Sequence, residues 1–258
     1  MATEQPQPRG AFVRADVKRA FEAPDWYFNN LNYRIRLRSE EIARMTRDTN
    51  FSKYIDIGCG DGSISIQLLN QNRRLTLQDL SSAMLKRASS LVPAKLQKNV
   101  TLVEGDFREA GLEKESYDLV ICLGVLSYID QLDPFFRQLN SLIKPGGQLI
   151  IECSDSVHPV SRLNRAYSWT TWNLKGRGTT GIQLQYHSSR AVDTSLKNLG
   201  FRLERRFRYS MPLPLIRSVF GQGFHYRANR LLHGTAQNPR LLWWGTECIF
   251  QFTKPSSK

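Results

Sequence analysis

The chain has 258 residues, 41% of them hydrophobic, which suffices for one globular domain with a full core. No apolar run reaches the roughly 20 residues of a membrane-spanning helix, and the polar, proline-rich start lacks the apolar segment of a signal peptide, so we expect a cytoplasmic protein. The formal net charge of +13 suits either a solvated basic surface or an anionic partner, such as nucleic acid, a membrane surface or a phosphorylated acceptor.

The N-terminal part is predicted to be helical over residues 13–47. The helix is expected to break at Ala23-Pro24-Asp25, because proline fits the first turn of a new helix. The next residues are rich in aromatic side chains, with Trp26, Tyr27, Phe28 and Tyr33. We expect these rings either to bury the helix against a sheet or to cover a pocket.

A glycine-rich loop follows the first predicted strand. Residues 54–57 are mainly apolar and include Asp56, the glycines Gly58, Gly60 and Gly62 come next, and a helix is predicted over about residues 63–70. Because glycine has no Cβ, a flat ligand can lie against this backbone, and the first N–H groups of the helix would point toward it. The pattern therefore predicts a nucleotide-cofactor loop.

The spacing of the glycines indicates which nucleotide is bound. A dinucleotide site requires G-x-G-x-x-G, but here the third glycine comes one residue early and Ser63 stands where Gly or Ala is expected. Asp56 would repel a pyrophosphate, whereas it suits a cationic or amine-bearing ligand. The run from Asp56 to Gly62, D-x-G-x-G-x-G, resembles motif I of the class I S-adenosylmethionine (SAM) methyltransferases. SAM carries an amino group, a sulfonium and no phosphate, which agrees with an acidic loop.

Acidic residues also follow the second and third predicted strands. Residues 75–78 lead to Asp79, about 20 positions past the glycine loop, where a carboxylate can accept hydrogen bonds from both ribose hydroxyls. The run from Asp79 to Leu85 is similar to the family's D-[IL]-S-x-x-M-L. After a third strand over 100–103, the resemblance implies that Asp106 bonds the adenine amine and that Phe107 packs on the ring. It assigns to the cofactor site Asp56, Gly58, Cys59, Gly60, Gly62, Asp79, Leu80, Met84, Asp106, Phe107 and Leu123.

The remaining elements complete a resemblance that covers residues 54–152. Residues 117–129 resemble the family's fourth strand and the loop after it, and residues 142–151 match the turn L-K-P-G-G-x-L before strand five. A helix over 188–199 and strands over 202–209 and 247–252 follow. We therefore predict an α/β fold: a Rossmann-like, seven-stranded, mostly parallel sheet with helices on both faces and with strand seven antiparallel.

The predicted methyltransferase domain spans residues 49–258 and is preceded by the helical segment 1–48, for which the resemblance implies a role as a lid over the cofactor. Two insertions, at about 154–187 and 210–244, are expected to build the acceptor pocket, because loops this long inside a compact domain are usually functional. Within the second insertion, residues 215–232 are amphipathic and rich in arginine. This pattern suits a lid helix or a helix that lies on a membrane.

The resemblance implies an SN2 transfer of the SAM methyl group to a small-molecule acceptor, with oxygen favoured over nitrogen as the attacked atom. Positioning contributes most to such a reaction, and a base adds roughly 10²–10⁴-fold for an oxygen nucleophile. The predicted catalytic residues are Tyr128, in the loop after strand four, and His158, while His187, His225 and Glu152 are further candidates for a base. The cysteines show no disulfide or metal-ligand spacing, so we expect reduced thiols and no metal site.

Two alternatives stay open at this point. The charge favours an RNA or protein methyltransferase, but no RNA-binding module is apparent, and Ser127-Tyr128 stands where enzymes that methylate base amino groups carry N/D-P-P-[YFW]. The other alternative is a catalytically inactive SAM-binding scaffold, against which the intact pocket acids argue. We expect a small-molecule acceptor, anionic or lipid-like, with peripheral membrane contact as an option and without nucleic acid. The oligomeric state does not follow from the sequence.

Overall fold

The structure is a computed structural model that describes residues 16–19, 21–22, 25–163, 165–166, 184–210, 223–224, 226–228, 230 and 245–256, with the backbone alone for residues 25–32. Its elements are α2 (Asp25–Met45), β1 (Lys53–Ile57), η1 (Ile66–Leu68), β2 (Arg74–Asp79), α3 (Ser82–Leu91), η2 (Ala94–Asn99), β3 (Val100–Glu104), β4 (Tyr117–Cys122), η3 (Leu126–Tyr128), α4 (Leu132–Leu142), β5 (Ile143–Ser154), α6 (Ser189–Asn198), β6 (Arg202–Tyr209) and β7 (Glu247–Thr253). The helix α2 begins directly after Pro24, as the sequence predicts.

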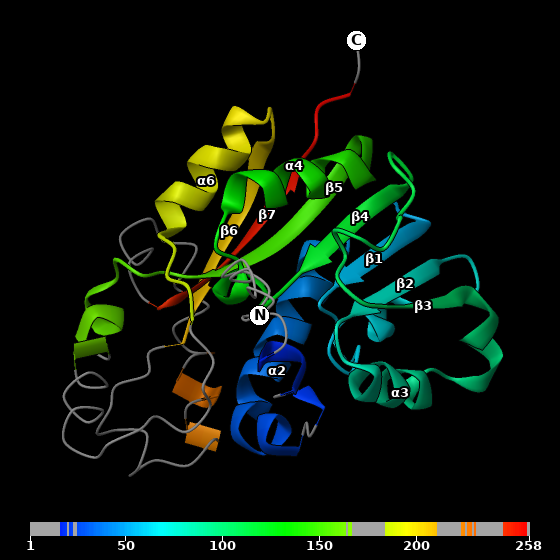
Figure 1. Ribbon diagram of the computed structural model, residues 1–258, viewed down its shortest axis with the longest axis horizontal. Helices are drawn as coiled ribbons and strands as arrows, with labels where there is room; N and C mark the ends of the chain where they lie inside the picture. Colours follow the sequence, from blue (N-terminus) through cyan, green and yellow to red (C-terminus); the bar gives the residue numbers. More distant parts are fainter. Residues whose placement is uncertain are drawn as a thin grey trace, which may run out of the picture.

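The seven strands form one sheet in the order β3-β2-β1-β4-β5-β7-β6 (Figure 1). The pairs from β3 to β5 are parallel, whereas β7 runs antiparallel to both β5 and β6. This arrangement confirms the predicted Rossmann-like sheet with an antiparallel strand seven. The strand order reverses between β1 and β4, and ligands in such sheets bind in the crevice outside the carboxyl ends of the strands at this point.

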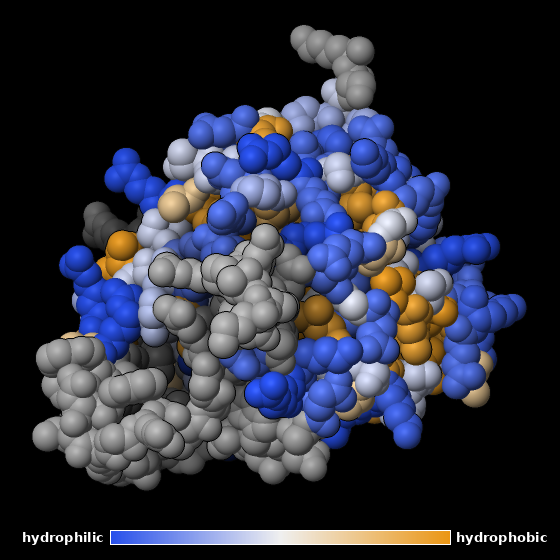
Figure 2. All heavy atoms as spheres, in the orientation of Figure 1, coloured by the Kyte–Doolittle hydropathy of each residue, from blue (hydrophilic) through white to orange (hydrophobic). Residues whose placement is uncertain are grey.

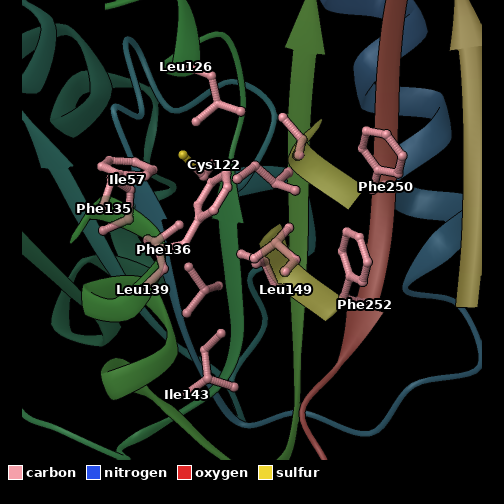
Figure 3. Packing of buried hydrophobic residues seen from close by; sticks show 14 of the residues in the cluster. Ile57, Cys122, Leu126, Phe135, Phe136, Leu139, Ile143, Leu149, Phe250 and Phe252 are labelled. Carbon is pink, nitrogen blue, oxygen red and sulfur yellow. The ribbon is translucent and has the colours of Figure 1, made fainter. Parts of the chain in front are cut away.

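Helices cover both faces of the sheet, and a hydrophobic cluster lies between the sheet and the helices on each face. One cluster joins β4, β5 and β7 to the apolar residues of α4 and α6. Figure 3 shows Phe135, Phe136 and Leu139 of α4 packing toward Cys122 and Leu149 of the sheet. The second cluster joins the sheet to α2 and α3. Strands buried on both faces read as continuous apolar runs, which explains the run of residues 119–122 in β4.

The prediction of a helix over residues 63–70 was wrong. The structure has only the 3₁₀ turn η1 there, and Leu69 after it is extended. The Ser65 carbonyl accepts from the Leu68 N–H at 3.0 Å, which is the i→i+3 bond of a 3₁₀ turn, and also from the Tyr54 hydroxyl at 3.0 Å. The β-branched Ile64 and Ile66 also favour helix weakly. The glycine loop therefore has no α-helix N-terminus behind it.

The predicted turn before strand five is part of β5. The helix α4 ends at Leu142, and the register of β4 against β5 shifts between Tyr117 and Leu119, opposite the Pro-Gly-Gly segment. Gly146 has a φ of 78° there, which favours glycine.

Hydrophilic residues cover most of the described surface seen in Figure 2, and hydrophobic residues form small separate patches, one of them over the edge strand β3. Within the described ranges, no helix combines the length and apolarity that crossing a bilayer requires. The four cysteines are unpaired thiols, and Cys122, Cys153 and Cys248 are buried. In the same part of the chain, no three His, Cys, Asp or Glu side chains gather as metal ligands would.

Candidate cofactor and acceptor site

A pocket lies at the carboxyl ends of β1 to β4, at the reversal of strand order. Its lining includes the glycine loop, the ends of β2 and β3, the loop after β4, and residues of the N-terminal segment. Of the predicted cofactor residues, all line this pocket except Gly62. Residues far apart in the sequence thus meet where the sheet topology places a ligand.

All three glycines of the loop have a positive φ, which favours glycine. Gly58 and Gly60 have φ values of 66° and 55°. A Cβ on Gly58 would lie 2.4 Å from Cγ2 of Val125, so this glycine lets the loop after β4 approach. A Cβ on Gly60 would meet nothing within 4 Å and would stand in the pocket, so this position leaves room for a ligand. Gly62 does not line the pocket: a Cβ there would lie 2.9 Å from Cδ1 of Ile66.

Asp79 connects the end of β2 to the glycine loop. Its Oδ2 accepts a hydrogen bond from the Gly60 N–H at 2.8 Å, and its Oδ1 accepts one from the Ser81 N–H at 2.9 Å. Burial raises the pKa of this carboxyl, while the bonds from Ser81 and Gly60 oppose the rise. Each carboxylate oxygen can accept a further bond, so a ligand diol can still bind from the pocket side.

The end of β3 forms the next part of the wall. Asp106 is held by Arg108, whose Nη2 lies 2.7 Å from Oδ2 and whose Nε donates to Oδ1 at 2.9 Å. Phe107 is buried and contacts Phe135 edge to face, with centroids 5.0 Å apart. The ion pair with Arg108 was not anticipated from the sequence, although the two residues are only two positions apart.

Asp56 is the most perturbed acid of the pocket. It is 4% exposed, and burial raises the pKa of its carboxyl to about 7, with the charges of Asp79 and Asp61 adding to the rise and a hydrogen bond with Ser65 opposing it. A cationic ligand would stabilise the ionised form of this carboxyl, because the ligand's charge compensates for the solvation that burial removes.

Arg38 is a pocket residue that the sequence analysis missed. Its Nη2 lies 2.6 Å from Oε2 of Glu152, and its Nε donates to Glu152 Oε1 at 3.0 Å and to the Tyr209 hydroxyl at 2.9 Å. A Cβ on Gly124 would lie 3.5 Å from Nη2, so the guanidinium reaches the loop after β4. Helical periodicity could have revealed its burial, because Arg38 lies on the buried stripe of α2 with Leu37, Glu41, Ile42 and Met45.

The predicted catalytic residues separate in the structure. Tyr128 lines the pocket and contacts Phe21 edge to face, with centroids 6.1 Å apart. His158 is buried outside the lining, where its Nδ1 accepts from the Val160 N–H at 3.2 Å. His187 lies with Nε2 2.7 Å from the Ile129 carbonyl oxygen. Of the other base candidates, Glu152 lies behind Arg38 and His225 is outside the described residues. The geometry thus supports Tyr128 and does not support His158.

The N-terminal segment crosses the pocket. Val17, Lys18 and Phe21 belong to its lining, Lys18 forms an ion pair with Glu104 at 2.9 Å, and the Ser81 hydroxyl donates to the Phe21 carbonyl at 3.0 Å.

None of the predicted lid aromatics has a described side chain in the pocket lining. Among the lid aromatics, Tyr33 lies away from the lining, its hydroxyl 3.4 Å from Ser210 Oγ, and the side chains of Trp26, Tyr27 and Phe28 lie outside the described residues. So do most of the two predicted insertions, including nearly all of residues 215–232. The lid and the domain division stay predictions.

Comparison with known proteins gives relatives in one class. Residues 55–149 match the family model of a methyltransferase domain. The ubiquinone biosynthesis O-methyltransferase of Rickettsia conorii is 27% identical over 139 residues, which cover 54% of this chain and 45% of the relative. The trans-aconitate 2-methyltransferase of Escherichia coli strain 55989 is 31% identical over 163 residues, which cover 62% and 61%. The chain thus spans about half the length of these relatives.

A solved structure extends the likeness in fold. Magnesium protoporphyrin IX methyltransferase from Synechocystis PCC 6803 with bound SAH has a TM-score of 0.64 at 17% identity and covers 94% of this chain and 99% of its own.

The pocket fits the cofactor of this class. SAM joins an adenosine to a methionine with an amino group and a carboxylate, and the pocket offers open space at Gly60, carboxylates at Asp56, Asp79 and Asp106, and a cation at Arg38. Fold, motif order and family match agree. Residues 55–149 thus match a methyltransferase domain, and the fold and motif order are similar to those of the SAM-dependent methyltransferases.

Proposed function

We propose that this chain transfers the methyl group of SAM to a small-molecule acceptor, at oxygen in preference to nitrogen. The observation that carries the proposal is a single pocket with two kinds of wall. One part holds the glycine loop and the acids that follow three consecutive strands, and the other part is apolar and aromatic, with Val17, Phe21, Tyr128 and Ile129. The preference for oxygen is supported by a relative named as an O-methyltransferase.

Each end of the cofactor has matching residues in the proposed complex. Asp79 accepts the ribose hydroxyls, and Asp106 with Phe107 holds the adenine. At the methionine end, Asp56 balances the amino group and Arg38 the carboxylate. This pairing agrees with the charges, because the acid and the cation both line the pocket and lie on different elements, β1 and α2.

Bound SAM would supply a methyl group attached to a sulfonium. As the acceptor oxygen bonds this carbon, the bond to sulfur breaks and SAH leaves as a neutral thioether. The chain's residues then have two tasks: to orient the acceptor and to keep water out. Phe21 and Tyr128 meet edge to face at the pocket, which makes this part of the wall apolar. The Tyr128 phenol can hydrogen-bond an acceptor hydroxyl and orient its lone pair, which accounts for a large share of the rate in such a reaction.

The acceptor is proposed to be small, and anionic or lipid-like. Lys18 and Arg38 add positive charge to a lining that is otherwise apolar on the acceptor side. The basic surface is proposed to need no nucleic acid partner. This statement is testable by salt, because phosphate contacts make affinity fall steeply between 50 and 200 mM salt for nucleic acid and scarcely for a small acceptor.

The experiment is a measurement of SAH release from SAM with a panel of acceptors. The panel pairs phenols and carboxylic acids with amines of the same carbon skeleton, so that only the attacked atom differs. The proposal expects turnover with oxygen acceptors and less with the amines. Turnover with RNA or protein alone, or SAM binding without transfer to any acceptor, would contradict it.

A further inference from the structure

We propose that Glu152 and Tyr209 are positioning residues for the cofactor: they fix the guanidinium of Arg38 in the orientation that binds the methionine carboxylate of SAM. The inference rests on the proposed function, because it assumes that Arg38 faces this carboxylate. It concerns two residues outside the pocket lining, which act through a third.

The geometry of the cluster is specific. Three elements meet: α2 brings Arg38, β5 brings Glu152 and β6 brings Tyr209. Glu152 binds the guanidinium through two oxygens, with Nη2 to Oε2 at 2.6 Å and Nε to Oε1 at 3.0 Å. The Tyr209 hydroxyl accepts from the same Nε at 2.9 Å and donates to Glu152 Oε1. All three side chains are buried.

This arrangement leaves the guanidinium few orientations. The carboxylate accepts a hydrogen bond from Nε and lies in ion-pair contact with Nη2, and the phenol bridges Nε and the same carboxylate oxygen, so three contacts restrict how the guanidinium can turn. Burial raises the pKa of Tyr209 well above its usual range, so the phenol stays protonated and keeps donating. A Cβ on Gly124 would lie 3.5 Å from Nη2 and 3.9 Å from Nη1, so both terminal nitrogens lie beside the loop after β4 that lines the pocket.

Stability alone does not account for the cluster, because buried ion pairs contribute little net stability compared with apolar residues of the same volume. Glu152 and Tyr209 contact Arg38, a cation of the pocket lining, which gives the cluster a role in binding. Misplacing a binding group by about 1 Å lowers affinity or rate strongly, so a rigid holder has a functional value.

The test compares two ligands by calorimetric titration of the full chain. SAM and decarboxylated SAM share the adenosine, the sulfonium and the amino group and differ in the carboxylate. The variants are Tyr209→Phe, which removes the bridging hydroxyl, and Glu152→Asp, which keeps the charge but shortens the side chain. Tyr117→Phe is the matched control, because Tyr117 is buried in the same sheet and bonds Thr76 outside the pocket lining.

We expect both variants to raise the Kd of SAM about tenfold, the size of one lost hydrogen bond to a charged group, and to leave decarboxylated SAM unchanged. The control should change neither. Equal weakening of both ligands, or of neither, overturns the positioning role, and so does a wild-type chain that binds the two ligands equally. A wild-type chain that binds neither ligand contradicts the proposed function as well, so the two failures are distinguishable.

Discussion

Replacing Asp56 by asparagine tests the electrostatics of the pocket most sharply. Burial raises the pKa of Asp56 from its ordinary value of 3.8 to about 7. The carboxylate is therefore disfavoured in the folded protein by about 4 kcal/mol relative to the unfolded chain. Asparagine keeps the shape without this charge, so we expect Asp56→Asn to stabilise the ligand-free protein, most strongly above pH 7.

The sign and the pH window follow from the direction of the change. Because the pKa is raised on folding, the folded state binds the proton more tightly, and the stability contribution of Asp56 is lost as pH rises from about 4 to about 7. The stabilisation by Asp56→Asn should therefore grow from about 2 kcal/mol at pH 5 to about 4 kcal/mol at pH 8. For a chain of this size, 1 kcal/mol corresponds to about 2 °C in Tm, which makes the difference at pH 8 about 8 °C.

The assay is thermal unfolding of both proteins at pH 5 and pH 8, followed by titration with SAM. The same substitution should weaken SAM binding, because the carboxylate that faces the cationic ligand is gone. Asp118→Asn is the opposite control: Ser52, Lys53 and Lys144 bond this carboxylate and its pKa is about 2, so asparagine should lower Tm. A Tm that falls in Asp56→Asn, or a change independent of pH, would refute the reasoning.

Three further predictions concern single pocket residues. Gly60→Val should abolish SAM binding, because the new side chain fills the open space, whereas Gly111→Ala, at a similar φ of 61° and away from the pocket lining, should reduce Tm without affecting binding. Asp79→Asn should raise the Kd of SAM roughly tenfold by removing charge-assisted bonds to the ribose, and unchanged affinity would exclude that contact. Tyr128→Phe should lower kcat roughly tenfold or more with the Kd of SAM unchanged, and equal kcat values would leave Tyr128 with a packing role only.

Local patterns were enough to predict the sheet. The apolar segments of β1, β4 and β7 and the acids at or after the ends of β1 to β3 are marked in the sequence itself, since strand periodicity and glycine spacing are local properties. The antiparallel direction of strand seven followed from the family resemblance. The observed β6, Arg202–Tyr209, has the predicted bounds.

Long-range contacts explain what could not be predicted. A 3₁₀ turn replaces the helix after the glycine loop, and its Ser65 carbonyl also accepts a hydrogen bond from the hydroxyl of Tyr54, 11 residues earlier. Arg38 reaches the pocket only because β5 and β6 present Glu152 and Tyr209 to it, and these residues are 114 and 171 positions away. Apart from its place on the buried stripe of α2, nothing local distinguishes Arg38 from Arg34 or Arg36, which lie four and two positions earlier.

The histidines illustrate the same limit. Sequence alone could not separate His158 from Tyr128 as a catalytic residue, because both follow predicted strands of the sheet. Folding places Tyr128 in the pocket wall and leaves His158 to accept a hydrogen bond from the backbone of Val160. Tyr128 follows β4, whose loop lines the pocket, whereas His158 follows β5 and lies outside the lining, and this difference depends on the whole sheet.

The central claim is that this pocket binds SAM. Calorimetric titration of the purified chain with SAM, and with NAD as the control, tests it most directly. The account predicts one-to-one binding of SAM with micromolar affinity and no binding of NAD, since the acidic loop suits a cationic ligand and repels a pyrophosphate. Binding of NAD, or no binding of SAM at neutral pH, would contradict it.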